Sequence, residues 1–191
     1  MGRMHMNRFL KVWPACLFLI SAGCAGYTPR IGQDDKPTPN DAYLYGKFSM
    51  RAPKVFLSID GHQSMGFALE CKNGERYVLR FSKDDPLQVI KILPSTCSLV
   101  ELVYTNAEGA VASRKPAPPG AMQNTVFAAG KAYYLGDFFA EATQSVAGNV
   151  INRQWRMTSM KDGYEATTQE MRTTFPNLSA LPTENRMIGK K

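Results

Sequence analysis

From residue 41 onward, apolar and polar positions alternate in short runs that predict β-strands. Such runs cover residues 43–50, 54–59, 67–71, 77–81 and 89–93, and a run dense in valine and leucine covers 97–105. Within one run, Phe67, Leu69 and Cys71 fall on the same face, because successive side chains of a strand point to opposite faces. The first half of the domain is therefore expected to be made of strands.

Turn-forming residues separate these runs. Asn73-Gly74 is typical of a type I′ hairpin turn, since both residues tolerate a positive φ. Residues 84–86 (Asp-Asp-Pro) and 94–96 (Pro-Ser-Thr) mark two more turns. This spacing of short strands and turns favours a sandwich or a barrel. We expect a mainly β protein, an antiparallel β-sandwich with one short C-terminal helix.

The pattern lapses after residue 105. Residues 106–123 hold three prolines and two glycines, which predicts a long loop that is either functional or simply mobile. Strands are expected again at 124–128, 131–140 and 150–160, and the last of these carries Trp155.

Residues 164–175 predict a short helix with Asp162 as its N-cap. Four side chains share one face at helical spacing: Tyr164, Thr168, Met171 and Phe175.

Pro176 ends the helix, so that the domain is expected to cover residues 41–178. We expect residues 179–191 to form a disordered basic tail, because they show no periodicity.

The first residues look like an export signal. Three basic residues are followed by a short apolar stretch at 12–20, by Ser21-Ala22-Gly23 and by Cys24. A cysteine after two small residues makes residues 1–23 resemble a bacterial lipoprotein signal peptide, which is cleaved before the cysteine after a lipid is attached to its sulfur. This resemblance implies that Cys24 is the lipid attachment site. The alternative is a plain secretory signal.

Residues 24–40, rich in proline and glycine, are expected to form a flexible tether between Cys24 and the domain. In the sorting rule of such lipoproteins, an aspartate after the cysteine favours retention in the inner membrane. Ala25 stands there instead, so the resemblance implies a lipid anchor in the bacterial outer membrane.

Composition narrows the class of protein. The 191 residues are 44% hydrophobic and 20% charged, as in an ordinary globular domain. Loss of residues 1–23 removes three of the 23 basic residues and lowers the formal charge from +7 to +4. Because the remaining basic residues are scattered, a nucleic-acid partner is not expected.

Three segments carry a resemblance to a known group of proteins. They are Tyr45-Gly46-Lys47-Phe48, the apolar strand after Leu93-Pro94, and residues 130–137 (GKAYYLGD). With these, residues 41 to about 160 are similar to Gram-negative outer-membrane lipoproteins of uncharacterised function. The resemblance implies an immunoglobulin-like or transthyretin-like sandwich, and it implies no catalytic residues.

Two cysteines remain after Cys16 leaves with the signal and Cys24 is modified. If consecutive strands are neighbours running up and down, Cys71 and Cys97 lie at the same end of the sandwich. In an oxidising compartment they are then expected to form a disulfide, stabilising by roughly 3–4 kcal/mol. Two separately buried thiols are the alternative.

Candidate chemistry is sparse. His62 and Ser64 lie in a segment that looks like a lipase nucleophile elbow, but two residues separate Gly61 from Ser64 where that motif has one. No spacing of metal ligands, phosphate loop or redox C-x-x-C motif occurs. We therefore expect no enzyme activity, no cofactor and no metal.

Two classes of function remain open. The first is a non-enzymatic binding or scaffold module that contacts a protein of the envelope through a sheet edge or residues 106–123. The second is a sandwich that binds a small ligand or carbohydrate through exposed tyrosines, for which the candidates are Tyr43, Tyr45, Tyr133 and Tyr134. Burial of these tyrosines would exclude the second class.

Overall fold

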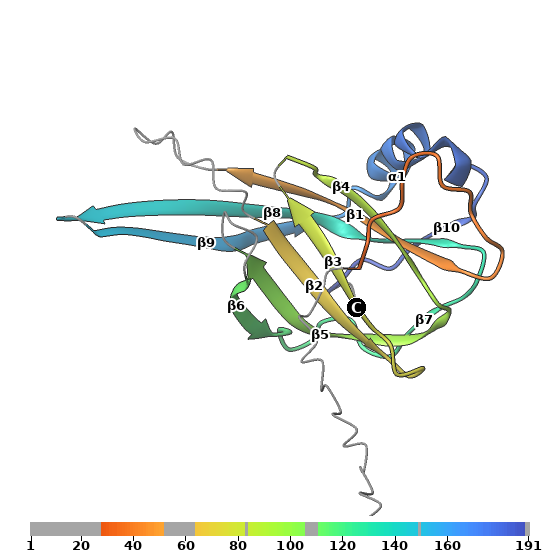
Figure 1. The fold of residues 1–191 in the computed structure, drawn as a ribbon, viewed down its shortest axis with the longest axis horizontal. Coiled ribbons are helices and arrows are strands. Elements are labelled where there is room, and N and C mark those ends of the chain that lie inside the picture. The colour runs from red at the N-terminus through yellow and green to blue at the C-terminus, as the bar shows by residue number, and fades with distance from the viewer. Residues whose placement is uncertain (1–27, 52–63, 83, 106–110, 149, 190–191) are drawn as a thin grey trace, which may run out of the picture.

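Two β-sheets stack to form a sandwich, and a helix lies against one of them (Figure 1). The computed structural model describes residues 28–51, 64–82, 84–105, 111–148 and 150–189. One sheet contains β1 (Ala42–Arg51), β4 (Leu87–Ile92), β8 (Ala132–Ala147), β9 (Val150–Lys161) and β10 (Thr183–Asn185). The other contains β2 (Ser64–Cys71), β3 (Arg76–Ser82), β5 (Ser95–Thr105), β6 (Val111–Pro116) and β7 (Thr125–Phe127). The prediction of a mainly β sandwich is confirmed.

We call the first sheet A and the second sheet B. In sheet A the strand order is β10-β8-β1-β4, with β9 also paired to β8; in sheet B it is β3-β2-β5-β6, with β7 also paired to β5. Sheet B is antiparallel throughout, whereas β8 runs parallel to both β1 and β10, so the prediction of an antiparallel sandwich is wrong for these two strand pairs. Consecutive strands are not always neighbours, because β4 follows β3 but pairs with β1 in the opposite sheet.

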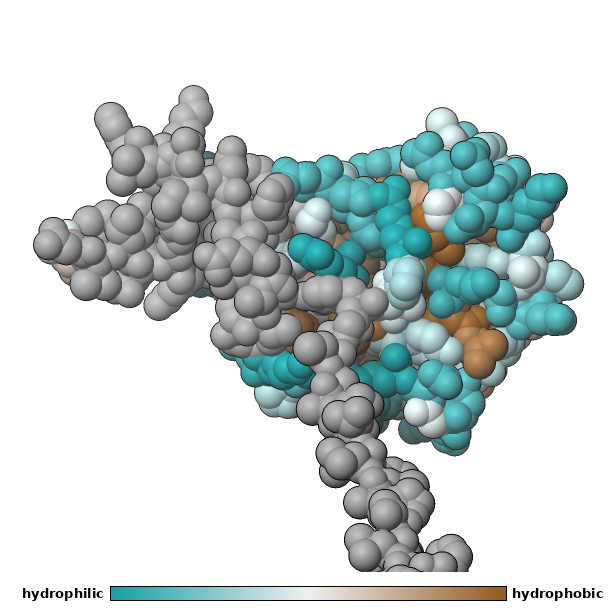
Figure 2. Space-filling model, viewed as in Figure 1, coloured by the Kyte–Doolittle hydropathy of each residue, from teal (hydrophilic) through white to brown (hydrophobic). Residues whose placement is uncertain are grey.

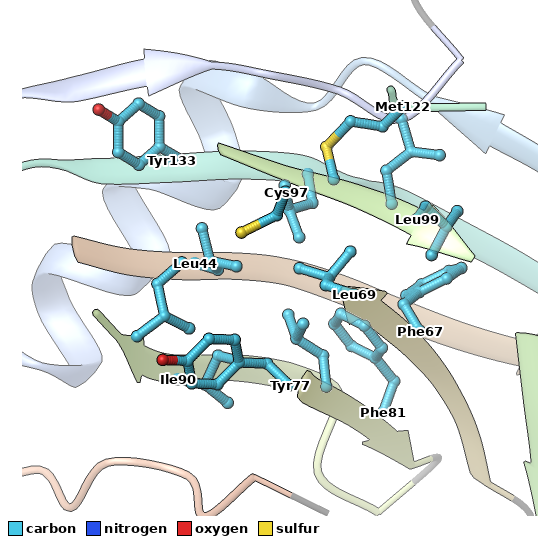
Figure 3. Close-up of a cluster of buried hydrophobic side chains, with 14 of the residues drawn as sticks. Leu44, Phe67, Leu69, Tyr77, Phe81, Ile90, Cys97, Leu99, Met122 and Tyr133 are labelled. Atoms are coloured by element: carbon cyan, nitrogen blue, oxygen red, sulfur yellow. The ribbon is translucent and has the colours of Figure 1, made fainter. Parts of the chain in front are cut away.

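The main core fills the space between the sheets. The described surface in Figure 2 is mostly hydrophilic, and Figure 3 shows apolar side chains of both sheets meeting inside, among them Leu44 and Ile90 of sheet A and Phe67 of sheet B. Phe138 of β8 packs against Phe67, with ring centroids 4.5 Å apart. Alternation along each strand supplies these inward-facing residues, as the sequence predicts.

A second apolar layer lies on the outer face of sheet A, under helix α1 (Tyr164–Thr174) and the 3₁₀ turn η1 (Pro176–Leu178). Met171 and Phe175 are fully buried there, which confirms the predicted helix and its apolar face. The predicted cap differs slightly: Gly163 occupies the N-cap position, while the Asp162 carboxylate accepts a hydrogen bond from the Tyr164 N–H at 3.2 Å.

Gly46 and Gly136 meet where β1 and β8 shift register. A Cβ at residue 46 would lie 2.8 Å from the Gly136 carbonyl oxygen, and Gly136 has a φ of +135°. Both glycines belong to the segments that carry the family resemblance. Their role here is to allow two backbones to approach closely.

Two predicted irregular segments contain ordered strands. Within 106–123, residues 111–116 form β6, which pairs with β5, so the prediction of one long loop is wrong there. Within 179–191, β10 pairs with β8 and Ile188 is buried in the main core. The prediction of a disordered tail is therefore wrong for residues 183–188. Strand pairing, rather than periodicity, orders both segments. The predicted strand at 54–59 lies outside the described residues.

Candidate functional site

The chain between Thr28 and Ile31, which we call the strap, is bound to both sheets. The Thr28 N–H donates to the Val78 carbonyl at 3.0 Å, and the Thr28 hydroxyl accepts the Val78 N–H at 2.8 Å, both on β3 of sheet B. The Ile31 N–H donates to the Val89 carbonyl on β4 of sheet A at 3.0 Å. The strap thus joins the lateral edges of the two sheets, and the predicted tether of residues 24–40 is wrong from Thr28 onward.

The strap is held by side chains as well as by its backbone. Ile31 is buried in the layer under helix α1. The Arg30 guanidinium forms an ion pair with the Asp85 carboxylate and stacks over the Phe175 ring, 5.3 Å from its centroid. These contacts explain why a proline-rich, polar segment is ordered.

A pocket of about 350 Å³ opens between the strap and the edges of β3 and β4. Its lining includes Arg30, Arg80, Ser82, Asp85 and Gln88. The Arg80 Nε donates to the Ser64 hydroxyl at 3.0 Å, and the Gln88 amide donates to the Asp85 carbonyl at 2.9 Å. Two guanidinium groups line the pocket, and guanidinium groups are donors that suit an anionic group.

A second polar cluster lies beneath the N-terminus of helix α1. The Tyr134 and Thr167 hydroxyls donate to the Asp137 Oδ1 at 2.9 and 2.8 Å, and the Gly163 N–H donates to the Tyr134 hydroxyl oxygen at 2.9 Å. Tyr45 and Thr168 share a hydrogen bond of 2.6 Å. The cluster fastens the helix to sheet A.

Burial governs the acidity of the phenols in this cluster. Desolvation raises the pKa of Tyr45 to about 12 and raises the pKa of Tyr134 as well. Both side chains are therefore neutral hydrogen-bonding groups at physiological pH, and neither supplies a phenolate for nucleophilic or base chemistry.

The four tyrosines predicted as an exposed ligand surface are all buried, each with at most 1% of its surface exposed. Tyr43, Tyr45 and Tyr134 lie under helix α1, and Tyr133 lies between the sheets. The ligand-binding alternative that depends on them is wrong, because the helix covers three of these tyrosines and the opposite sheet covers Tyr133.

The candidate nucleophile is also placed by the structure. Ser64 begins β2 and is 1% exposed, so its hydroxyl does not face the solvent. His62 lies outside the described residues, as does Cys24 with the whole signal-like segment. The predicted lipidation of Cys24 therefore stays a prediction.

The predicted disulfide between Cys71 and Cys97 is confirmed, but the strand arrangement that brings the two cysteines together differs from the predicted one. The two residues are direct register partners in the adjacent strands β2 and β5, with their Cα atoms 4.0 Å apart. The prediction assumed consecutive strands lying side by side, whereas β4 lies in the other sheet.

Within the described residues, no group of three or more potential ligands could hold a metal ion. In the same residues, no helix is both long and apolar enough to span a membrane. Contact between residues 106–123 and a partner stays a prediction.

Sequence reasoning missed the arginine pocket. Arg30 sits in a segment that looks like a linker, and its partner Asp85 is 55 residues away in the sequence. Arg80 alternates with buried residues of β3 and looks like any solvent-facing position. One sequence signal could have indicated that residues 28–31 pack on the domain: Ile31 is a large apolar residue among polar neighbours.

Comparison with known proteins reveals no family. No protein-family model matches the chain, and no curated protein matches it. A leucine-rich repeat protein from Bacteroides thetaiotaomicron VPI-5482 aligns at 9% identity with a TM-score of 0.35, over 66% of this chain and 19% of that chain. A "putative cell adhesion protein" from Bacteroides uniformis ATCC 8492 aligns at 14% identity with a TM-score of 0.27, over 63% of this chain and 50% of that chain. This chain thus spans half or less of the length of either protein.

Proposed function

We propose that this protein is a lipid-anchored, non-enzymatic binding module of the bacterial cell envelope. The observation that carries the proposal is the distribution of its cysteines. Cys24 directly follows the signal-like segment, and the two cysteines beyond it, Cys71 and Cys97, form a disulfide. Disulfides persist in oxidising compartments, so the pairing supports export of the domain.

The proposed location is the outer membrane, with the domain bound through the lipid on Cys24. Ala25, in place of an aspartate, supports this location. The proposed partner is another envelope protein, and the edge of β9 is the surface proposed for it. Among the described strands, β9 pairs only with β8. An unpaired edge offers backbone donors and acceptors to an extended segment of a partner.

The environment of the candidate nucleophile, Ser64, supports a binding function rather than a catalytic one. The Ser64 hydroxyl is buried and accepts a hydrogen bond from Arg80. A catalytic nucleophile must instead reach its substrate and a base. The double variant His62→Ala with Ser64→Ala is expected to rescue the phenotype of a deletion strain, provided that it is folded and localised. A failure of the folded variant to rescue would favour a catalytic function.

Membrane partition tests the anchor. Cys24→Ser is expected to move the protein from the membrane fraction to the soluble or secreted fraction, because the acyl chains are lost. Cys16→Ser, which changes another cysteine of the same segment, is the matched control and should leave the protein in membranes. Unchanged membrane association of Cys24→Ser contradicts the lipid anchor.

Site-specific crosslinking tests the partner. A photo-crosslinking residue at Thr158, exposed on β9, is expected to give a discrete crosslinked product in intact cells. The same residue at Glu165, exposed on helix α1, is the control. Equal products from both positions, or none from Thr158, would count against binding at the β9 edge.

A further inference from the structure

The strap begins only four residues after Cys24. Four extended residues reach at most about 14 Å. A free tether over residues 24–40 would instead span roughly 20–25 Å on average and would leave the domain free to rotate. Because the chain is already hydrogen-bonded to β3 at Thr28, that freedom is lost.

A lipidated cysteine lies at the membrane surface, where the headgroup region of each leaflet is about 5–8 Å deep. The strap therefore cannot leave the neighbourhood of the headgroups. The edge of the sandwich that the strap covers, formed by β3 and β4, is the part of the domain that must lie closest to the lipid.

The chemistry of this edge fits such a position. Arg30 and Arg80 line the pocket there, with the Ser82 hydroxyl and the Gln88 side chain nearby. A guanidinium group matches the oxygens of a phosphate and binds them through paired hydrogen bonds. The Asp85 carboxylate holds Arg30 in place.

We propose that the β3–β4 edge rests on the membrane and that the pocket between Arg30 and Arg80 receives the phosphate of a phospholipid headgroup. This inference rests on the proposed lipid anchor at Cys24. It deepens the proposed function, because it fixes which side of the domain faces the lipid and which side faces a partner.

The orientation is tested with the full-length lipidated protein in vesicles of phosphatidylethanolamine and phosphatidylglycerol that contain a headgroup-attached quencher. A fluorophore is placed on Asp84→Cys, in the exposed turn between β3 and β4, or on Val126→Cys, which is 59% exposed on β7. The strands β2 and β5 separate β7 from β3. At about 4.8 Å for each strand, the two reporters differ by roughly 14 Å in distance from the covered edge.

We expect quenching to be several-fold stronger at position 84 than at position 126. A long Gly-Ser linker inserted between Gly26 and Tyr27 should leave the protein in the membrane fraction but reduce the difference. Equal quenching at both positions in bound protein overturns the inference and leaves the anchor intact. Failure of the protein to bind vesicles at all contradicts the proposed anchor instead.

The pocket is tested in the linker variant, where the short connection no longer forces contact. The remaining excess quenching at position 84 then reports the affinity of the pocket for headgroups. Arg80→Gln is expected to lower this affinity about tenfold, the value of a charge-assisted hydrogen bond. Arg76→Gln, on the same face of β3, should leave it unchanged.

Arg80→Lys separates the phosphate contact from folding, because it keeps the positive charge while removing the planar group that pairs with phosphate. It is expected to remain folded under the assay conditions, with a modestly lower unfolding midpoint because the Nε–H donor to Ser64 is lost, and to weaken binding. Equal losses for Arg76→Gln and Arg80→Gln would show that only overall charge matters, and would overturn the pocket assignment.

Discussion

The Asp137 carboxylate lies directly against Gly163, so closely that a Cβ at residue 163 would overlap its Oδ2 atom. Asp137 belongs to β8, and Gly163 is the residue that precedes helix α1. The Oδ1 atom of the same carboxylate accepts hydrogen bonds from Tyr134 and Thr167. The start of the helix is therefore placed by a contact that only glycine permits.

Gly163→Ala is expected to destabilise the protein by about 1–3 kcal/mol, because the Asp137 carboxylate must move and lose its partly buried hydrogen bonds to Tyr134 and Thr167. Urea unfolding measures the change. Gly32→Ala is the matched control: its Cβ would meet the Asp35 carboxylate at an ordinary 3.4 Å, so a change within about 0.5 kcal/mol is expected. Equal effects of the two variants would contradict this account.

Stability should fall as the pH rises above 10. The unfolded Tyr45 loses its proton near its ordinary pKa of 10.0, while the buried Tyr45 keeps it until about 12. Over that range the unfolded chain binds fewer protons, so each pH unit removes about 1.4 kcal/mol. Urea midpoints at several alkaline pH values measure the slope.

Tyr45→Phe should reduce this slope without abolishing it, because it removes one of the two buried phenols whose pKa is raised and leaves Tyr134. Thr168→Val deletes the hydrogen-bond partner of Tyr45 but keeps the phenol, so it should lower stability at every pH and preserve the slope. An unaltered slope in Tyr45→Phe would exclude Tyr45 as a source of the alkaline loss.

Reduction of the Cys71–Cys97 disulfide is expected to lower the free energy of unfolding by about 3–4 kcal/mol in the chain-entropy model. The two cysteines are 26 residues apart, so the bond restricts a substantial loop of the unfolded chain. Unfolding with and without reductant measures the effect. The double variant Cys71→Ser with Cys97→Ser should not respond to reductant. A wild-type protein equally indifferent to reductant would refute the prediction.

Ile188→Ala is expected to cost about 2–4 kcal/mol, because the side chain is 5% exposed and packs in the main core. Leu93→Ala removes a side chain that is 53% exposed and should cost less than about 0.5 kcal/mol. Similar thermal unfolding midpoints for the two variants would mean that the C-terminal segment does not belong to the stable core.

Short-range sequence patterns predicted the strands, the turns and the helix, because these elements depend on interactions between residues close in the sequence. The alternation at residues 67–71 and 77–81 marks β2 and β3, and Asn73-Gly74 marks the position of their turn, because strand period and turn preference depend on near neighbours. The predicted type I′ geometry is wrong, since Gly74 has a positive φ and Asn73 does not. The helix was visible because its periodicity is also short-range. Its apolar face also implied a covered sheet face, and that reciprocal signal could have shown that Tyr43 and Tyr45 are buried.

Pairings between distant segments were not predictable in this way. β4 crosses to the sheet opposite β3, which the sequence of neither strand indicates. Arg30 and Asp85 become partners only after both sheets have formed. The short polar strand β10 is held by its pairing with β8 rather than by an apolar face of its own, so no periodic pattern in its sequence predicts it.

The strap also limits how copies of this protein can associate. A sandwich with open edges on both sides can add neighbours indefinitely, and such growth leads to filaments. Here backbone hydrogen bonds from Thr28 and Ile31 already occupy the β3 and β4 edges. If two copies join through β9 of sheet A, each copy presents the strap-covered β4 edge on the far side of that sheet, and strand addition across sheet A ends at a pair.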